Sequence, residues 1–365
     1  MEIWRDKTFW RKITQTNENL GSLPMRLLTA ITLSLFTFTA LAQSGSSVEP
    51  GQFFGAKQTT HPDWFKESFL EFEDDIEEAA AEDKRLMVYF HQDGCPYCNK
   101  LVEENFQDPD ISAKVRAHFD LVAINMWGDR EVVQVGGRQF TEKTLAEALN
   151  VNFTPTLLFF SEDRNVALRL DGYHPPMEFI HALDYVSQKK EQEIPYPEYI
   201  AGIKEHKSSG DLNTADFIQS PPYDLRSTDK PVAVLFEEPD CEPCDLLHQK
   251  TFQNESAPEI LAQFDVIQLN RWSNQEVITP DGTNTTALQW SKDLGLSFSP
   301  SIALFNTEGE QIILVDAMFK TFHVLGVFDY VASKAYEHEP SFQRYLSERA
   351  EHIQATGKDV NIWSY

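Results

Sequence analysis

Residues 84–106 read KRLMVYFHQDGCPYCNKLVEENF, and residues 230–252 read KPVAVLFEEPDCEPCDLLHQKTF. Each stretch starts with a short apolar run rich in strand-forming residues and continues into a CxxC motif. The two motifs together contain all 4 cysteines of the chain. After the first motif, apolar residues follow at helical spacing. The sequence therefore predicts, twice, a strand that ends at a CxxC motif and a helix that starts there.

The similarity between these stretches extends over most of the chain as an internal repeat. After a shift of 146 positions, which later becomes 145, HFDLVAINMW (118–127) matches QFDVIQLNRW (263–272). LNVNFTPTLLFF (149–160) matches LGLSFSPSIALF (294–305) with the same shift. The chain therefore contains two copies of one module.

Each copy is expected to have the same order of elements, an α/β pattern in which buried strands alternate with helices. In the first copy, the expected strands are 85–90, 120–125, 157–160 and 166–173. The expected helices are 75–84, 99–106, 141–151 and 176–190. Trp127, Trp272, Phe153 and Phe298 recur in register in the two copies, and we expect them in the core.

The N-terminal residues have the pattern of a secretory signal. From Met25, the sequence places Arg26 before an apolar run of about 15 residues, which ends at Ala40-Leu41-Ala42. This run is shorter than the roughly 20 residues that a membrane-spanning helix needs. We therefore expect residues 1–42 to direct export to the periplasm, with translation starting at Met1 or Met25. The alternative is an uncleaved signal that anchors the chain in the membrane, facing the periplasm.

These patterns divide the chain into five parts. The linker between the modules is rich in Ser, Pro and Asp. The expected parts are a signal sequence with a basic extension at 1–42, a flexible lead at 43–61, the first module at 62–210, the linker at 211–229, and the second module with a C-terminal helix at 230–365.

The composition is strongly acidic, with a net charge of −26. Nucleic acids and anionic lipids bind basic surfaces, so neither is an expected partner. The acidic residues are spread along the chain, which is typical of a solvated surface. The charge therefore argues against nucleic acids and anionic lipids as partners, but it does not identify a substrate or an oligomeric state.

Each module also has a proline motif about 60 residues after its cysteines. CPYC at Cys95–Cys98 is followed by Thr154-Pro155, and CEPC at Cys241–Cys244 is followed by Ser299-Pro300. In these motifs the chain resembles periplasmic thioredoxin-like proteins of the SoxW kind and the C-terminal domain of the disulfide reductase DsbD. The resemblance implies two tandem thioredoxin-fold modules, each a central mixed sheet flanked by helices. It also implies that Pro155 and Pro300 are cis and that these loops face the sulfurs and bind substrate.

The CxxC spacing suits thiol–disulfide exchange. A sulfur at the start of a helix is near free N–H groups and the positive end of the helix dipole, which favour the thiolate. Cys95 and Cys241 are thus the expected nucleophiles. Cys98 and Cys244, one turn further along the helix, are expected to resolve the mixed disulfide. No cofactor and no metal are expected.

Two other uses of the cysteines are possible. Two CxxC pairs can form a four-cysteine zinc site, although here each pair belongs to its own repeat. The pairs can also be inert structural disulfides, and this alternative applies more to the second pair. A CxxC ring closes too few residues to stabilise a fold strongly, which argues against it.

One feature of thioredoxins is missing. They have a buried acid six residues before the first cysteine, and here these positions are Tyr89 and Leu235. Proton transfer from the resolving thiol must therefore use another group or water. His91, four residues before Cys95, is either such a group or an exposed histidine.

The charges near the two motifs differ. Acidic residues surround Cys241, whereas Asp93 is the near acid of Cys95, with His91 and Lys100 also close in sequence. Negative neighbours raise the pKa of a thiol. We therefore expect the lower thiol pKa at Cys95 and the main catalytic role in the first module.

The sequence thus predicts an exported thiol–disulfide oxidoreductase that acts on protein thiols and disulfides. The resemblance implies the reducing direction and a membrane electron donor of the DsbD or CcdA type. The alternatives are a disulfide isomerase or oxidase, and a tandem binding module whose second CxxC is inert.

Overall fold

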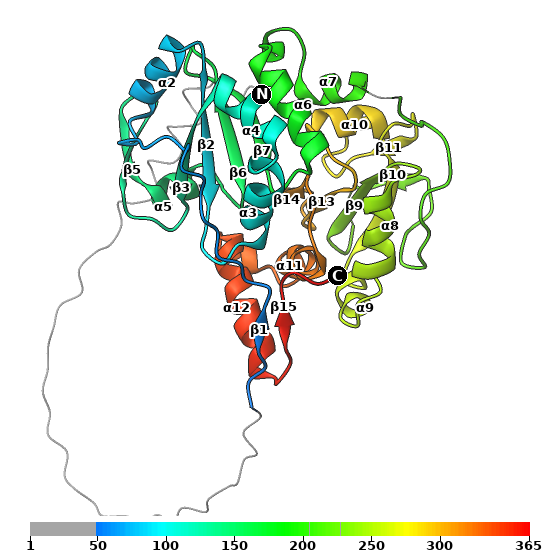
Figure 1. Cartoon of the computed structure of the whole chain (residues 1–365). Helices are drawn as coiled ribbons and strands as arrows, with labels where there is room; N and C mark the ends of the chain where they lie inside the picture. Colours follow the sequence, from blue (N-terminus) through cyan, green and yellow to red (C-terminus); the bar gives the residue numbers. More distant parts are fainter. Residues whose placement is uncertain (1–48, 204, 227) are drawn as a thin grey trace, which may run out of the picture.

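The computed structural model describes residues 49–203, 205–226 and 228–365, so the expected signal at 1–42 lies outside the described residues. In this described part, each module has a four-stranded sheet with helices on both faces (Figure 1). The predicted fold class, an α/β structure of two tandem modules that each have a central mixed sheet flanked by helices, is confirmed. Among the described helices, none is long and apolar enough to cross a membrane.

The first module has the strand order β3-β2-β6-β7, in which β2 is parallel to β3, and β6 is antiparallel to both β2 and β7. The sheet strands are β2 (Arg85–His91), β3 (Phe119–Asn125), β6 (Thr156–Phe160) and β7 (Val166–Asp171). The helices are α2 (Phe72–Ala81), α3 (Pro96–Lys100), α4 (Pro109–His118), α5 (Glu142–Ala148), α6 (Pro176–Ser187) and α7 (Tyr196–Ile203). A hairpin that the sequence did not predict joins β3 to α5, formed by β4 (Glu131–Gln134) and β5 (Arg138–Thr141).

The second module repeats this topology in the order β10-β9-β13-β14. Its sheet strands are β9 (Val232–Glu237), β10 (Asp265–Asn270), β13 (Ser301–Phe305) and β14 (Gln311–Val315). Its helices are α8 (Glu242–Leu246), α9 (Ala257–Leu261), α10 (Ala287–Asp293), α11 (Thr321–Ala332) and α12 (Phe342–Ala355). Within the expected linker 211–229, residues Tyr223–Asp224 form β8, which pairs with β11 (Glu276–Ile278); β11 also pairs with β12 (Asn284–Thr286).

The apolar run that precedes each CxxC motif is buried on both faces of its sheet. In β2, Met87 and Tyr89 pack with α3 and α6, whereas Leu86, Val88 and Phe90 pack with α2 and α5. Successive side chains of a strand point to opposite faces, so a strand covered on both sides needs apolar residues at every position. This requirement explains why the run does not alternate with polar residues.

The helix after each motif is partly π-helical. The predicted helix 99–106 contains the end of α3 and the π-helix η2 (Leu101–Phe106). In the second module α8 continues into the π-helix η4 (Leu247–Thr251), which starts at the repeat-equivalent position. π-Helical turns are rare and often occur at functional sites.

The two modules contact each other through equivalent segments. Tyr173, after β7, forms an antiparallel bridge with Met318, its counterpart after β14. The modules are therefore related by a local pseudo-two-fold axis. Phe153, which was expected in the core of the first module, is buried against the second module. It contacts Phe319 and Phe342 of the second module.

The two ends of the described chain meet. In the expected lead 43–61, β1 (Phe53–Phe54) pairs in parallel with β15 (Val360–Asn361), and both lie beside α12 below the first module in Figure 1. Three residues after β1, Lys57 bridges to Gly94, directly before Cys95. The lead thus links the C-terminal strand to the active-site turn of the first module.

Candidate active site

Both cysteine pairs are disulfide-bonded within their own modules, with Cα–Cα distances of 5.3 Å for Cys95–Cys98 and 5.2 Å for Cys241–Cys244. In each pair the first sulfur is at the N-cap of its helix. It accepts a hydrogen bond from the N–H of the second cysteine, at 3.0 Å in the first module and 3.2 Å in the second. The same N–H groups would stabilise a thiolate after reduction.

The residue before the first cysteine has a positive φ in both modules. It is Gly94 at +75° and Asp240 at +57°. Glycine adopts this left-handed conformation freely, and aspartate tolerates it better than most residues. The chain therefore enters both motifs through the same backbone turn.

The loop before β6 lies against the first sulfur. The Thr154–Pro155 peptide bond is cis. The Thr154 hydroxyl donates to Sγ of Cys95 at 3.4 Å, and the Thr154 carbonyl oxygen is 3.6 Å from the same sulfur. Pro155 is buried behind this contact, and its carbonyl accepts from the Gly172 N–H at 2.8 Å.

The equivalent loop of the second module reaches the cavity that Cys241 faces. The Ser299–Pro300 bond is cis, and Ser299 lines a cavity together with Cys241. Pro300 follows Ser299 but does not line this cavity. The structure thus brings each expected loop to the cysteines of its own module.

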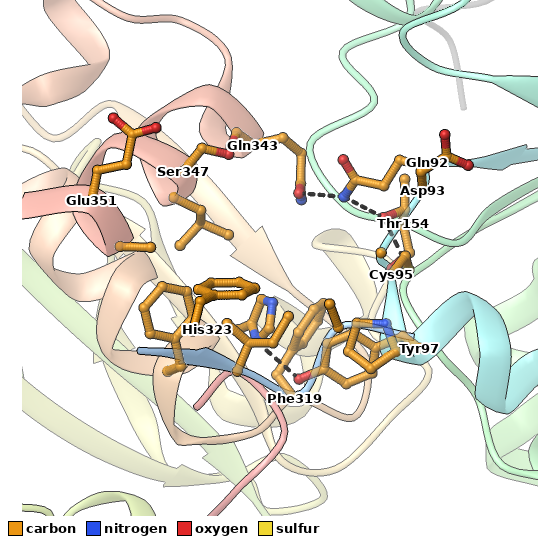
Figure 2. A pocket seen from close by; sticks show the side chains of 18 of the residues that line it. Gln92, Asp93, Cys95, Tyr97, Thr154, Phe319, His323, Gln343, Ser347 and Glu351 are labelled. Carbon is orange, nitrogen blue, oxygen red and sulfur yellow. Dashed lines mark hydrogen bonds between the residues drawn. The ribbon is translucent and has the colours of Figure 1, made fainter. Parts of the chain in front are cut away.

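Cys95 faces a cavity of about 310 Å³ that both modules form. Figure 2 shows Cys95 and Thr154 on one side and Gln343 of α12 across from them. Phe319 and His323 of the second module also line the cavity. Cys95 is only 4% exposed.

A chain of hydrogen bonds crosses this cavity. The Trp127 indole N–H donates to Gln92 at 2.8 Å, and the Gln92 amide donates to Thr154 at 2.9 Å and to Gln343 at 2.6 Å. Gln343 in turn donates to the Asn152 carbonyl at 2.8 Å. Trp127, expected as a core residue, therefore positions a side chain of the site.

Tyr97, in the middle of the CPYC motif, is covered by the second module. Its hydroxyl accepts from the Lys320 backbone N–H at 2.8 Å and lies 3.2 Å from Nδ1 of His323. Burial lowers the pKa of His323 to about 3, which agrees with a neutral ring. The ring of Trp363 also contacts Tyr97.

Cys241 faces a second cavity, of about 340 Å³, completed by the first module. His174 and Glu178 reach it from the loop after β7 and from α6. His174 contacts Phe298, the repeat equivalent of Phe153, with a ring-centroid distance of 6.0 Å. Each CxxC therefore faces a cavity that the other module closes, and Cys241 is 8% exposed.

The sequence did not predict the role of Arg271, a buried cation at the second site. Arg271 is 2% exposed, and its guanidinium donates to the carbonyls of Leu296 and Phe298 and to the Ser299 hydroxyl. These bonds hold the loop that precedes Pro300. Burial lowers the pKa of Arg271, and the nearby Asp316 and Glu238 oppose that effect. The first module has the buried Met126 at the equivalent position. An arginine at a position where the other repeat has methionine was the sequence signal for a buried cation.

A buried acid does occur in the second module, at a position that the sequence did not predict. Glu237, at the end of β9, is 0% exposed. It accepts from His248 at 2.8 Å and from Gln268 at 2.9 Å. Alternate residues share a face of a strand, so Glu237 lies on the same face as Leu235. Leu235 packs against η4 and α11.

His91 occupies the position of Glu237 in the first module. It is partly buried, and its ring lies 4.4 Å from the ring of His61. Burial and the neighbouring His61 lower its pKa to about 4, so His91 is neutral near pH 7. Among the described residues, no group of three or more His, Cys, Asp or Glu side chains is arranged to bind a metal ion.

The sequence pattern of the thioredoxin-like domain family matches residues 72–187 and 223–325, more than half of the chain. Similar solved structures include a thioredoxin-fold protein from Helicobacter pylori, with 22% identity and a TM-score of 0.29, covering 30% of this chain and 73% of its own. A thioredoxin from Thermus thermophilus has 23% identity and a TM-score of 0.25, covering 38% and 89%. The first two thioredoxin domains of Eps1p from Saccharomyces cerevisiae have 12% identity and a TM-score of 0.23, covering 71% and 95%. None of the curated proteins matches the chain.

The buried His323 makes stability depend on pH. Its folded pKa of about 3 is below the unfolded value of 6.5, so the unfolded state binds more protons between these values. Its stabilising contribution is complete above pH 6.5 and is lost as the pH falls toward 3. We expect His323 to lower the free energy of unfolding by about 2 kcal/mol between pH 7.5 and pH 5.

Urea titrations at the two pH values measure this loss. The His323→Gln variant should lose less stability on acidification than the wild type, because glutamine does not titrate. His352→Gln, which removes an exposed histidine of α12, is the control and should behave as the wild type. An equal loss in all three proteins would contradict the role of His323.

Arg271 should lower the pKa of Cys241. Replacing it by methionine, the residue of the first module, should raise the thiol pKa by about 1 unit in a chain whose first cysteine pair is serine. Alkylation rates of the reduced protein across pH measure this change. Arg271→Lys keeps the charge without the paired loop contacts and should keep the lower pKa. A raised pKa in both variants would show that the loop geometry matters and the charge does not.

Proposed function

Since the chain belongs to the thioredoxin-like domain family, we propose that it is exported and reduces disulfides of protein substrates. The chain is a thiol–disulfide oxidoreductase with two redox-active CxxC pairs. The observation that supports the reaction best is shared by both modules. A disulfide-bonded first cysteine caps a helix and shares a cavity with the residue before a cis-proline.

We assign Cys95 and Cys241 as the attacking residues of the reduced protein. The thiolate attacks one sulfur of the substrate disulfide, forms a mixed disulfide and releases the first substrate thiolate, which takes a proton from water. Cys98 or Cys244 then attacks the mixed disulfide and releases the second thiolate. The substrate gains two electrons, and the CxxC pair becomes a disulfide.

Thr154 and Ser299 are assigned to substrate binding, together with Pro155 and Pro300. The attacked chain would lie along these loops in an extended conformation. In the second module we propose that the buried pair of Glu237, at the end of β9, and His248, in η4, takes the proton of the resolving thiol. In the first module His91, whose pKa is lowered to about 4, is too weak a base to take a thiol proton, so we assign this proton transfer to water.

The finer assignments rest on the resemblance to SoxW-type proteins and DsbD. They are removal of residues 1–42 on export to the periplasm, the reducing direction, and a membrane electron donor of the DsbD or CcdA type. We also propose modules at 62–210 and 230–365, joined by the linker 211–229. The lower thiol pKa at Cys95 stays a prediction, and Arg271 acts against it.

Single cysteine variants test the exchange reaction. Cys95→Ser should abolish reduction of a short disulfide-bonded peptide by the first module, because the attacking thiol is missing. Cys98→Ser should trap the peptide as a mixed disulfide that mass spectrometry detects. Both variants are made in a chain with serine at 241 and 244. The control is that same chain with Cys95 and Cys98 intact. Full activity of Cys95→Ser would contradict the assignment.

Redox equilibration of each pair tests the direction. A reductant should have a potential near that of thioredoxin, about −270 mV, because its disulfide form must be the stable one. Values above about −180 mV, between protein disulfide isomerase and DsbA, would instead support the isomerase or oxidase alternative. Separate measurements on the two single-pair chains also show whether the second CxxC is inert.

A further inference from the structure

Both attacking sulfurs are covered by the opposite module. A reactive cysteine is ordinarily partly exposed, yet Cys95 and Cys241 are 4% and 8% exposed. The cover at Cys95 comes from α11 and α12, and the cover at Cys241 comes from α6 and α7. A disulfide on the rigid surface of a folded protein has no direct approach to either sulfur in this arrangement.

Several contacts hold this closed arrangement at the first site. Gln343 bonds to Gln92 and to the Asn152 carbonyl, and the neighbouring Arg344 forms a 2.6 Å ion pair with Glu147. Lys320 and His323 of the second module form hydrogen bonds with Tyr97, which is a third contact between the modules. The cover is therefore made of packed helices and not of a loose loop.

The size of the cavities limits what can reach the sulfurs. Their volumes of about 310 and 340 Å³ are at the lower end of the range for small-molecule sites, roughly 300–1,000 Å³. Such a space accepts a small disulfide or a few residues of an extended peptide.

The charge of the cavities limits the substrate further. Asp93 and Glu351 line the cavity at Cys95, and the described residues that line it include no lysine or arginine. The cavity at Cys241 is lined by four carboxylates, from Glu178, Glu238, Asp240 and Glu242. Its arginine, Arg271, already donates to the loop before Pro300. Of the four carboxylates, Asp240 is paired with Lys207, and Glu238 is bonded to His206. With Arg271 and Lys207 counted, each site still has more carboxylates than cations and should attract cations and repel anions.

We propose that the closed modules select small or extended disulfides flanked by positive charge and exclude anionic disulfides and those of folded proteins. This inference rests on the exchange reaction proposed above. The shared chemistry is an aliphatic disulfide beside ammonium or guanidinium groups. It can come from a diamine disulfide or from a short basic peptide.

The reaction on such a substrate is balanced by the CxxC pair alone. The Cys95 thiolate attacks R–S–S–R to form Cys95–S–S–R and R–S⁻. Cys98 then attacks Sγ of Cys95, which closes the intramolecular disulfide and releases the second R–S⁻. Protons from the thiols and water convert both products to thiols, and a dithiol reductant restores the pair for another cycle.

Three disulfides of similar size and different charge provide the test. Cystamine is cationic, 2-hydroxyethyl disulfide is neutral, and dithiodiglycolate is anionic. Their rates of reduction are measured with a pre-reduced chain that carries serine at 241 and 244, and each rate is divided by the rate with dithiothreitol alone. We expect the normalised rate for cystamine to be at least about ten times that for dithiodiglycolate at low ionic strength. High salt should make this ratio of rates smaller.

A matched pair of variants tests whether the cavity causes this preference. Glu351→Gln should reduce the ratio about two- to threefold, because it removes a carboxylate from the cavity. Glu348→Gln makes the same charge change on the same helix, at an exposed position outside the cavity, and should leave the ratio unchanged. Equal effects of the two variants would overturn the proposal in favour of general surface charge.

Insulin and a short lysine-flanked cysteine peptide, supplied as its disulfide-linked dimer, test the size limit and the peptide source. The peptide should react at a normalised rate near that of cystamine, and insulin at least about tenfold more slowly. Gln343→Ala with Arg344→Ala removes cross-module bonds and should raise the rate for insulin relative to cystamine. Equal normalised rates for all substrates would overturn the selectivity but leave the exchange function intact. If no disulfide oxidises the Cys95–Cys98 pair faster than it oxidises dithiothreitol, the exchange function itself fails.

Discussion

The contact between Tyr173 and Met318 determines what each redox centre faces. The two residues occupy equivalent positions, and the Met318 N–H donates to the Tyr173 carbonyl at 3.2 Å. Because equivalent segments meet, the contact is reciprocal. The residue after Tyr173, His174, reaches the cavity of Cys241, and the residue after Met318, Phe319, reaches the cavity of Cys95. One local pairing thus closes two active sites.

This closure changes the chemistry of groups near the sulfurs. Tyr97 and His323 share a hydrogen bond in the buried contact between the modules, where a charged ring would lose its hydration. The neutral ring is therefore part of the contact between the modules. At the second site, Arg271 contributes a buried positive charge where the first module has Met126. Two repeats with one backbone fold consequently have different electrostatic surroundings for the same reaction.

The fold could be predicted from the sequence because its signals are local and occur twice. The strand 85–90 and the helix that begins at the CxxC motif follow from residue spacing, and the repeat gives an independent second reading. The β4–β5 hairpin and helix α4 were not predicted, because their short segments lack a clear apolar period. β8 was missed because its two residues pair only after the linker folds back onto β11.

The sequence alone determined the two CxxC pairs, their proline loops and the strands that carry them, because these depend on residues close together in the chain. The roles of Thr154 and Ser299 in substrate binding stay predictions, although each lies beside the expected cysteine. Only the tertiary structure decided that Phe153 lies between modules, that His323 covers Tyr97, and that Glu237 and Arg271 are buried. Each of these depends on which surfaces of two similar modules meet, and spacing within one module contains no information about that choice.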